Sequence, residues 1–248
     1  MKNFELIFFA TADELAHAAA GAWLDEIESA HRAGKLHGVA LSGGRIAQKF
    51  FASVVEQAKA RKIRDGGTPS LPNNVHFFWA DERCVPPGDP ESNFRLAQEL
   101  LFAPLGIPEN QIHRLRGEAS PAIAVQEAEA ELRQIAPTNL AGQPVLDLVL
   151  LGMGEDGHVA SLFPGAPAGI VHDTAPFLTV ENSPKPPPGR LSLSYAAIAA
   201  AKQVWVLISG AGKEEALRES VDGSGKPPLG RVIQLRQSTR IYSEIRPN

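Results

Sequence analysis

Three side chains that can exchange or orient protons lie together in one glycine-rich segment, 152–165. Glu155, Asp156 and His158 fall within four positions of one another. A histidine has an ordinary pKa of about 6.5, so its imidazole can accept and return a proton near neutral pH. Because a carboxylate beside an imidazole suits general acid–base chemistry, we treat this segment as the candidate catalytic loop.

The catalytic loop follows a predicted strand. Residues 145–151 are apolar apart from Asp147 and rich in branched side chains, which predicts a strand covered on both faces, as in parallel sheets. In open α/β sheets, ligands bind at the carboxyl ends of the strands. The loop therefore begins where a binding site is expected.

The glycines of the loop match the spacing G-x-G-x-x-G at Gly152, Gly154 and Gly157, which alone would suggest a dinucleotide site. That site requires a long helix directly after the glycines, whereas Pro164 and Pro167 leave room for about two turns. The two carboxylates of the loop would also repel a pyrophosphate. We therefore reject the dinucleotide interpretation.

Composition predicts one α/β domain, 1–248, with room for a small appended subdomain. The chain has 248 residues, of which 44% are apolar and 21% charged, enough to bury a full core. Its formal net charge of -4 provides no basic field for nucleic acid. We therefore expect a small-molecule partner and no nucleic acid, with any anionic ligand held by local cations.

The sequence predicts neither a membrane segment nor a secretory leader. No apolar run approaches the ~18 residues of a membrane helix, and the apolar run 6–10 is shorter than the core of a signal peptide. Cys84 is the single cysteine, so no internal disulfide can form. These features favour the reducing cytoplasm.

Three further predicted strands end in segments rich in glycine or charge. The run 38–41 leads into a turn whose amides, at a helix start, could bind an anion; a tight turn with an exposed arginine explains the pattern equally well. The runs 75–79 and 204–208 lead into a polar loop and a glycine-rich turn. The residues in the first turn are Ser42, Gly43, Gly44 and Arg45.

The glycine-rich turn 209–213 reads SGAGK, yet it is not a P-loop. Leu207 stands in place of the first glycine, and Glu214 stands where a serine or threonine should bind magnesium. Lys213 remains as a cation at a strand-to-helix turn, a position that suits a phosphate. Because parallel strands end at one edge of a sheet, we expect all four segments to form one pocket, suited to acid–base chemistry on a sugar phosphate.

Five motifs of the chain resemble those of the 6-phosphogluconolactonase family, within the superfamily of glucosamine-6-phosphate deaminase and ribose-5-phosphate isomerase. They occur in the family's order and span roughly residues 38–213. The continuation ASLFP after DGH favours the lactonases, because the related deaminases continue differently. The motifs are LSGGR (41–45), WADERCVP and ESNF (within 79–94), GMGEDGHVASLFPG (152–165), PKPPPGRLSLS (184–194) and SGAGK (209–213).

The resemblance implies a three-layer, modified Rossmann-like α/β fold with a mostly parallel central sheet. It also implies hydrolysis of 6-phospho-D-glucono-1,5-lactone to 6-phosphogluconate in the pentose phosphate pathway, without a cofactor. The chain departs from the family where Ile46 and Ala47 replace a Thr-Pro pair, and the segment after Gly225 matches poorly. Any phosphate contact by that threonine hydroxyl is therefore absent here.

The reaction assigns roles to these residues. Water must lose a proton as it attacks the lactone carbonyl and the ring oxygen must gain one, so His158 could serve both steps as a single base. Asp156 could orient the imidazole, or it could instead be a helix N-cap. Arg83 would bind the substrate or the developing oxyanion, with a salt bridge to Asp81 as the alternative. Lys213 would hold the phosphate, unless it is a solvated lysine.

The remaining assignments concern binding and support. We expect Asp81 and Arg190 to contact the substrate or its phosphate, together with Arg45 and the preceding serine and glycines. Asn93 is expected to brace the loop that contains Arg83, and Cys84 to be a buried bystander.

Three alternatives stay open at this point. The first is a sugar-phosphate isomerase or deaminase on the same fold, and the second is a non-catalytic sugar-phosphate sensor. The third is a metal site built from Glu155, Asp156, His158 and His172, which we do not expect because two ligands in one tight loop rarely complete a coordination set.

Overall fold

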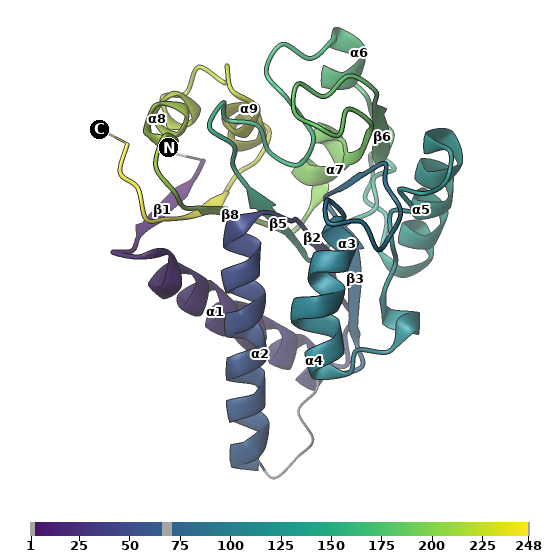
Figure 1. Ribbon diagram of the computed structural model, residues 1–248, viewed down its shortest axis with the longest axis vertical. Coiled ribbons are helices and arrows are strands. Elements are labelled where there is room, and N and C mark those ends of the chain that lie inside the picture. Colours follow the sequence, from purple (N-terminus) through teal and green to yellow (C-terminus); the bar gives the residue numbers. More distant parts are fainter. Residues whose placement is uncertain (1–2, 66–70, 248) are drawn as a thin grey trace.

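A six-stranded parallel sheet forms the centre of the structure, a computed structural model that describes residues 3–65 and 71–247 (Figure 1). Nearly all residues of its inner strands are buried, as expected for strands covered on both faces. In spatial order the strands are β1 (Glu5–Phe8), β9 (Arg240–Ser243), β8 (Gln203–Ile208), β5 (Leu148–Gly152), β2 (His37–Leu41) and β3 (Val75–Trp79).

Helices cover both faces of this sheet, which gives three layers (Figure 1). On one face lie α1 (Ala12–Arg32) and α2 (Arg45–Asp65); on the other lie α7 (Tyr195–Ala200), α8 (Glu214–Val221) and α9 (Pro228–Gln234). Thr11 caps α1 by accepting a hydrogen bond from the Glu14 amide, and the helix stops before Gly34, whose φ is +64°. The predicted three-layer fold with a mostly parallel sheet is confirmed.

A second, antiparallel sheet lies beside the first, in the order β4 (Asp81–Arg83), β7 (Arg190–Leu193), β6 (Phe177–Val180). The prediction of a polar loop directly after the run 75–79 was wrong, because residues 81–83 form β4. Ala80 connects the two sheets. Its amide donates to the Leu41 carbonyl in the first sheet, and its carbonyl accepts from the Leu193 amide in the second. Since a single residue separates β3 from β4, we propose that both sheets belong to one folding unit.

Shorter helices complete the fold around the second sheet and the strand ends. Residues 93–102 begin as an α-helix capped by Ser92 and continue as a π-helical segment. The predicted strand 145–151 begins later, at Leu148. The carboxylate of Asp147, just before it, accepts hydrogen bonds from the Gly38 amide and from Lys202. The remaining elements are α3 (Asn93–Ala97), η1 (Gln98–Phe102), α4 (Ala103–Leu105), η2 (Glu109–Gln111), α5 (Pro121–Ile135) and α6 (Ala168–Val171).

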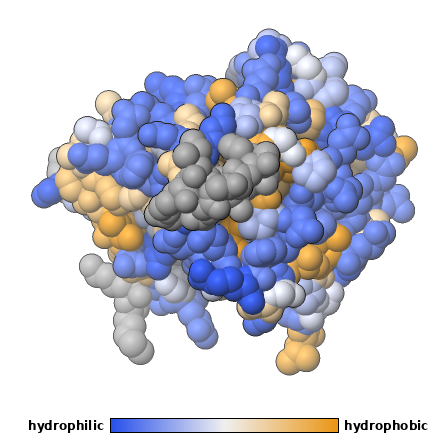
Figure 2. Space-filling model, turned by 90° about the horizontal axis from the view of Figure 1, so that it is seen from below, coloured by the Kyte–Doolittle hydropathy of each residue, from blue (hydrophilic) through white to orange (hydrophobic). Residues whose placement is uncertain are grey.

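Hydrophilic residues predominate on the face shown in Figure 2, and hydrophobic ones lie there in separate groups, as is ordinary for a helix-covered face. Among the described residues, no helix is both long enough and apolar enough to span a membrane.

Candidate active site

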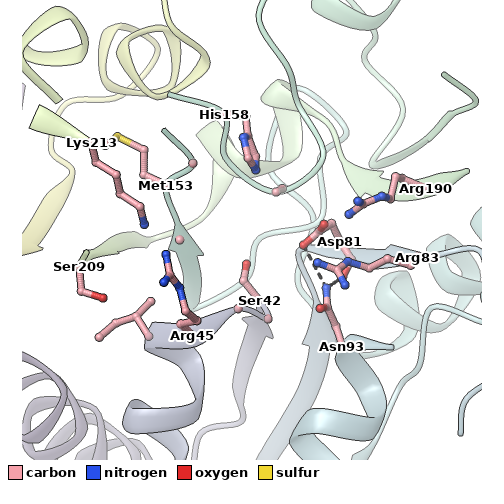
Figure 3. A pocket seen from close by; sticks show the side chains of 16 residues that line it. Ser42, Arg45, Asp81, Arg83, Asn93, Met153, His158, Arg190, Ser209 and Lys213 are labelled. Atoms are coloured by element: carbon pink, nitrogen blue, oxygen red, sulfur yellow. Dashed lines mark hydrogen bonds between the residues drawn. The ribbon is translucent and has the colours of Figure 1, made fainter. Parts of the chain in front are cut away.

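One pocket gathers the ends of the strands that the sequence singled out (Figure 3). Its lining includes residues that follow β2, β5 and β8 and residues of β4, so the predicted convergence is confirmed. Arg190 joins it from β7, opposite Arg83 in the register of the second sheet. The predicted residues in the lining are Ser42, Gly43, Gly44, Arg45, Asp81, Arg83, His158, Arg190 and Lys213.

The imidazole of His158 projects into this pocket (Figure 3). Asp156, which is not part of the lining, forms a hydrogen bond with the imidazole Nδ1. Its Nδ1 lies 2.5 Å from Asp156 Oδ1, and the same oxygen accepts from the His158 backbone amide at 3.3 Å. An ionised carboxylate only accepts hydrogen bonds, so Nδ1 carries the proton and Nε2 keeps its lone pair. Asp156 is not a helix N-cap, because no helix begins there.

The protonation states of this pair suit a base. Burial lowers the pKa of His158 below its ordinary value, and the hydrogen bond with Asp156 opposes this without overcoming it. Burial acts to raise the pKa of Asp156, but the hydrogen bond and charge of His158 outweigh it and lower that pKa. At neutral pH the pair is therefore a neutral imidazole beside a carboxylate, ready to accept a proton.

Glycine and one strained alanine shape the catalytic loop. A Cβ on Gly154 would lie 2.1 Å from two ring atoms of His158, so only glycine permits this close approach. Ala160, a pocket residue, has a φ of +47°, rare for a residue with a side chain. Directly after it, Ser161 donates a hydrogen bond of 2.7 Å to Asp81, which ties the loop to β4.

One end of the pocket carries two cations, Arg45 and Lys213 (Figure 3). Burial and then the positive charge of Arg45 lower the pKa of Lys213, so the two cations lie close enough to repel each other. Lys213 is partly buried rather than a fully solvated lysine. An anion between the two would relieve the repulsion, which is the physical reason to expect a phosphate here.

The turn before Arg45 is fixed by its neighbours. A Cβ on Gly43 would lie 1.9 Å from Asn93 Oδ1, and Gly44 has a φ of +95°, so both positions need glycine. The hydroxyl of Ser42, just after β2, donates to the carbonyl of Leu150 in β5 at 2.8 Å and so joins the two strands. This bond occupies the hydroxyl's proton, so Ser42 can meet a ligand through its lone pairs or backbone.

The other end of the pocket carries Arg83 and Arg190 (Figure 3). Arg83 does not pair with Asp81, the alternative considered from the sequence; its ion-pair partner is Glu91, at 3.4 Å. Its Nε is buried without a hydrogen-bond partner. Burial and then the charge of Arg83 lower the pKa of Arg190. A second pair of mutually repelling cations therefore faces the same cavity.

Arg190 also has a structural task that the sequence did not indicate. Its Nε and Nη2 donate to the carbonyls of Lys185, Pro186 and Pro187 at 2.9 to 3.2 Å, so it holds the loop before β7 in place. A buried arginine that closes a proline-rich loop has no local sequence signal.

Asp81 and Asn93 brace the wall between these arginines and the catalytic loop. The side-chain amide of Asn93 donates to the Asp81 carbonyl at 2.9 Å, as expected for a bracing residue, and also lines the pocket. Asp81 is buried, and its carboxylate accepts from Ser161. The structure thus gives Asp81 a bracing contact in addition to its place in the pocket lining.

Sequence reasoning missed one supporting residue and placed another wrongly. Glu82 is buried, and its carboxylate accepts from the amides of Arg83, Asn93 and Phe94, which fixes the chain on both sides of the arginine. An acidic residue between Asp81 and Arg83 was the available signal. Cys84, expected to be buried, is only partly so.

The pocket has three further lining residues that the sequence did not single out, namely Met153, Ala160 and Ser209. Ser209 directly follows β8 as Ser42 follows β2. Since ligands bind at the carboxyl ends of the strands, its position in the sequence could have identified it. His172, the most distant member of the metal alternative, lies outside this lining, 3.5 Å from Arg231. Across the described parts of the chain, no group of three or more His, Cys, Asp or Glu side chains is arranged to hold a metal ion.

Comparison with known proteins places this geometry in a family. Residues 10–241 match the family model described as glucosamine-6-phosphate isomerases/6-phosphogluconolactonase. The chain belongs to this family. The match includes every residue of the pocket lining, so the family assignment covers the candidate site as well as the fold.

Individual relatives in the family agree with the match. A 6-phosphogluconolactonase of Mycobacterium tuberculosis is 34% identical over 206 residues, which cover 75% of this chain and 82% of that protein. One from Streptomyces coelicolor is 33% identical over 228 residues, covering 90% and 84%. The solved structure of the Trypanosoma brucei 6-phosphogluconolactonase superposes with a TM-score of 0.83 at 26% identity, covering 98% of this chain and 97% of that one.

Proposed function

We propose that this chain hydrolyses 6-phospho-D-glucono-1,5-lactone to 6-phosphogluconate, as a lactonase of the pentose phosphate pathway. The observation that carries the proposal is a neutral imidazole placed between two pairs of mutually repelling cations (Figure 3). A phosphorylated lactone has a phosphate at one end and develops negative charge on the carbonyl oxygen at the other. Its charge distribution therefore complements that of the pocket.

His158 is the proposed base of the first step. Its Nε2 takes a proton from water as the water oxygen forms a bond to the lactone carbonyl carbon. Asp156 keeps the Nδ1 proton in place and stabilises the imidazolium that results. Because burial keeps the free imidazole neutral, the base is available at neutral pH.

The second step returns the proton. The tetrahedral intermediate collapses by breaking the bond between the carbonyl carbon and the ring oxygen, and that oxygen takes the proton from the imidazolium. The product is an open-chain acid, which ionises to a carboxylate in water. Arg83 and Arg190 are the proposed partners of the oxyanion and then of the carboxylate, because charge-assisted hydrogen bonds are strongest to a localised anion.

The phosphate is assigned to the opposite end of the pocket. Arg45 and Lys213 would supply its charge partners, and the backbone of Gly43 and Gly44, which carries no Cβ, would approach it closely. Ile46 lines the pocket where the family has threonine, so this chain would hold the phosphate without that hydroxyl.

A deaminase or isomerase acting on an amino-sugar phosphate is the second candidate, since the family description includes such enzymes. The cation pair near Arg83 favours a substrate that develops anionic charge there. A non-catalytic sensor is less well supported, because it would not need the oriented neutral imidazole.

The single cysteine and the pathway together favour a cytoplasmic enzyme.

The test of the proposal compares two substrates with one enzyme preparation. Acid release from freshly prepared 6-phosphogluconolactone is measured beside ammonia release from glucosamine 6-phosphate. We expect enzyme-dependent acid release and no ammonia. Ammonia release without lactone hydrolysis would establish the deaminase, and calorimetric binding of 6-phosphogluconate without either activity would establish the sensor.

Replacing Lys213 by alanine should raise the KM for the phosphorylated lactone about 10-fold or more, with kcat little changed. The phosphate lies away from the reacting carbonyl, so its binding contributes equally to ground and transition states. Unphosphorylated gluconolactone should be hydrolysed at nearly the wild-type rate. Lys202→Ala, outside the pocket, is the control, and an equal loss on both substrates would contradict the phosphate assignment.

Treatment with EDTA should leave the rate of lactone hydrolysis within about twofold of the untreated enzyme. A lactone carbonyl is already electrophilic, and an imidazole base is expected to contribute roughly 10² to 10⁴ in rate without a Lewis acid. The rate is measured after dialysis with and without added zinc. Loss of most activity, restored by zinc, would refute metal independence.

A further inference from the structure

Lys185 is a half-exposed lysine that contacts the back of the proposed catalytic pair. Its Nζ lies 3.9 Å from Asp156 Oδ1, the same oxygen that bonds His158 Nδ1 at 2.5 Å. Ammonium, carboxylate and imidazole therefore form a chain of contacts. Lys185 does not line the pocket, so its contact with the site is through Asp156.

The backbone of Lys185 is held from two sides, which fixes where the side chain begins. Its carbonyl accepts from Arg190 Nη2 at 3.2 Å and from the Ser183 hydroxyl at 2.8 Å, and its amide donates to the same hydroxyl at 3.2 Å. None of these bonds uses the ammonium group. A substitution of the side chain can therefore remove the charge while the loop keeps its anchors.

Resting on the proposed function, we propose that Lys185 is a positioning residue that acts on the catalytic base through Asp156 and keeps His158 in its neutral, proton-accepting form. A cation on the far side of the carboxylate draws part of its negative charge away from the imidazole. The carboxylate then stabilises the imidazolium less, and the neutral form persists to lower pH.

The groups around the imidazole shift its pKa in opposite directions, and Lys185 acts in the direction that the inference requires. Burial has the largest effect and lowers the pKa of His158; Asp156 raises it, Lys185 lowers it, and Asp81 from β4 raises it. The remaining cations of the pocket line the same cavity and stay in place in every variant described below. Removing the positive charge at position 185 should therefore raise the pKa of His158.

The experiment measures the pH at which His158 titrates in the full-length protein, with the Lys185→Gln variant beside wild type. The acid limb of the kcat/KM profile for lactone hydrolysis should move to higher pH by about half a unit to one unit, the range expected for a partly screened charge at this separation. The substrate phosphate also titrates, with a pKa near 6, but equally for each variant, so the difference reports the enzyme. Spontaneous lactone opening is subtracted at each pH.

Two variants separate charge from structure. Lys185→Arg keeps the positive charge and should restore the wild-type midpoint. Lys202→Gln removes a lysine that pairs with Asp147 at the start of β8, at the opposite edge of the sheet, and should leave the midpoint unchanged. An unshifted midpoint in Lys185→Gln, or a raised KM with no shift, would overturn the inference, the second result by showing direct contact with the substrate.

An NMR titration of the His158 ring without substrate separates this inference from the proposed function. A higher ring pKa in Lys185→Gln than in wild type supports the inference, whether or not the lactone is hydrolysed. Equal ring pKa values overturn it, even if hydrolysis is confirmed. Failure of the proposed function would appear separately, as a wild-type enzyme that does not accelerate lactone opening.

Discussion

Replacing His158 by glutamine should lower kcat for lactone hydrolysis by about 10² to 10⁴, with KM little changed. Glutamine can keep a hydrogen bond to Asp156, but it cannot accept a proton from water. The proposed phosphate contacts, at the other end of the pocket, are left intact. Steady-state kinetics on fresh lactone, with the spontaneous rate subtracted, measures the effect.

The matched control for this variant is His172→Gln. His172 lies outside the pocket beside Arg231, so its replacement should leave the rate within about twofold of wild type. It also tests the metal alternative, in which His172 was a ligand. A folded His158→Gln enzyme within threefold of wild type would reduce His158 to a structural residue and move the base to Asp156 or favour the sensor.

Adding one methyl group at Gly154 should lower kcat by about 10²-fold or more. The new Cβ would lie 2.1 Å from the His158 ring and 2.8 Å from Asp156 Oδ1, so the imidazole must move. A displacement of about 1 Å in a catalytic group can cost about 10² in rate. The backbone at this position has no left-handed φ, so the loss would come from the contact with the ring and not from backbone strain.

The control for the Gly154→Ala enzyme is Gly169→Ala. Gly169 lies in α6, where an added Cβ meets nothing within 4 Å. That variant should keep wild-type kcat and thermal stability. If Gly154→Ala retained wild-type kcat in a folded protein, the tight packing of glycine against the imidazole would have no catalytic importance.

Much of the fold could be predicted because its determinants are local. Strands covered on both faces leave continuous apolar runs, and capping residues such as Thr11 and Ser92 mark where helices begin. Because parallel strands end at the same edge of a sheet, the sequence also predicted, without knowledge of the packing, that four segments meet there. These are the segments after Leu41, Trp79, Leu151 and Ile208.

The contacts that organise the site could not be predicted, because they join residues far apart in the sequence. Residues 81–83 form a strand only because β7, more than a hundred positions later, is there to pair with them. Two sets of hydrogen bonds depend on that second sheet: the bond from Ser161 to Asp81, and those from Arg190 to the carbonyls of the proline-rich loop. The residue types alone indicated acid–base chemistry. The partner of each side chain, such as Glu91 for Arg83, could be identified only in the folded structure.

The most direct test of the central claim is a pH-stat titration of freshly prepared 6-phosphogluconolactone at constant neutral pH. We predict that base uptake exceeds the spontaneous rate in proportion to enzyme concentration, that one proton is released per lactone opened, and that the excess nearly vanishes with His158→Gln. Base uptake that equals the blank at every concentration of folded wild-type enzyme would contradict the assignment of this chain as a lactonase.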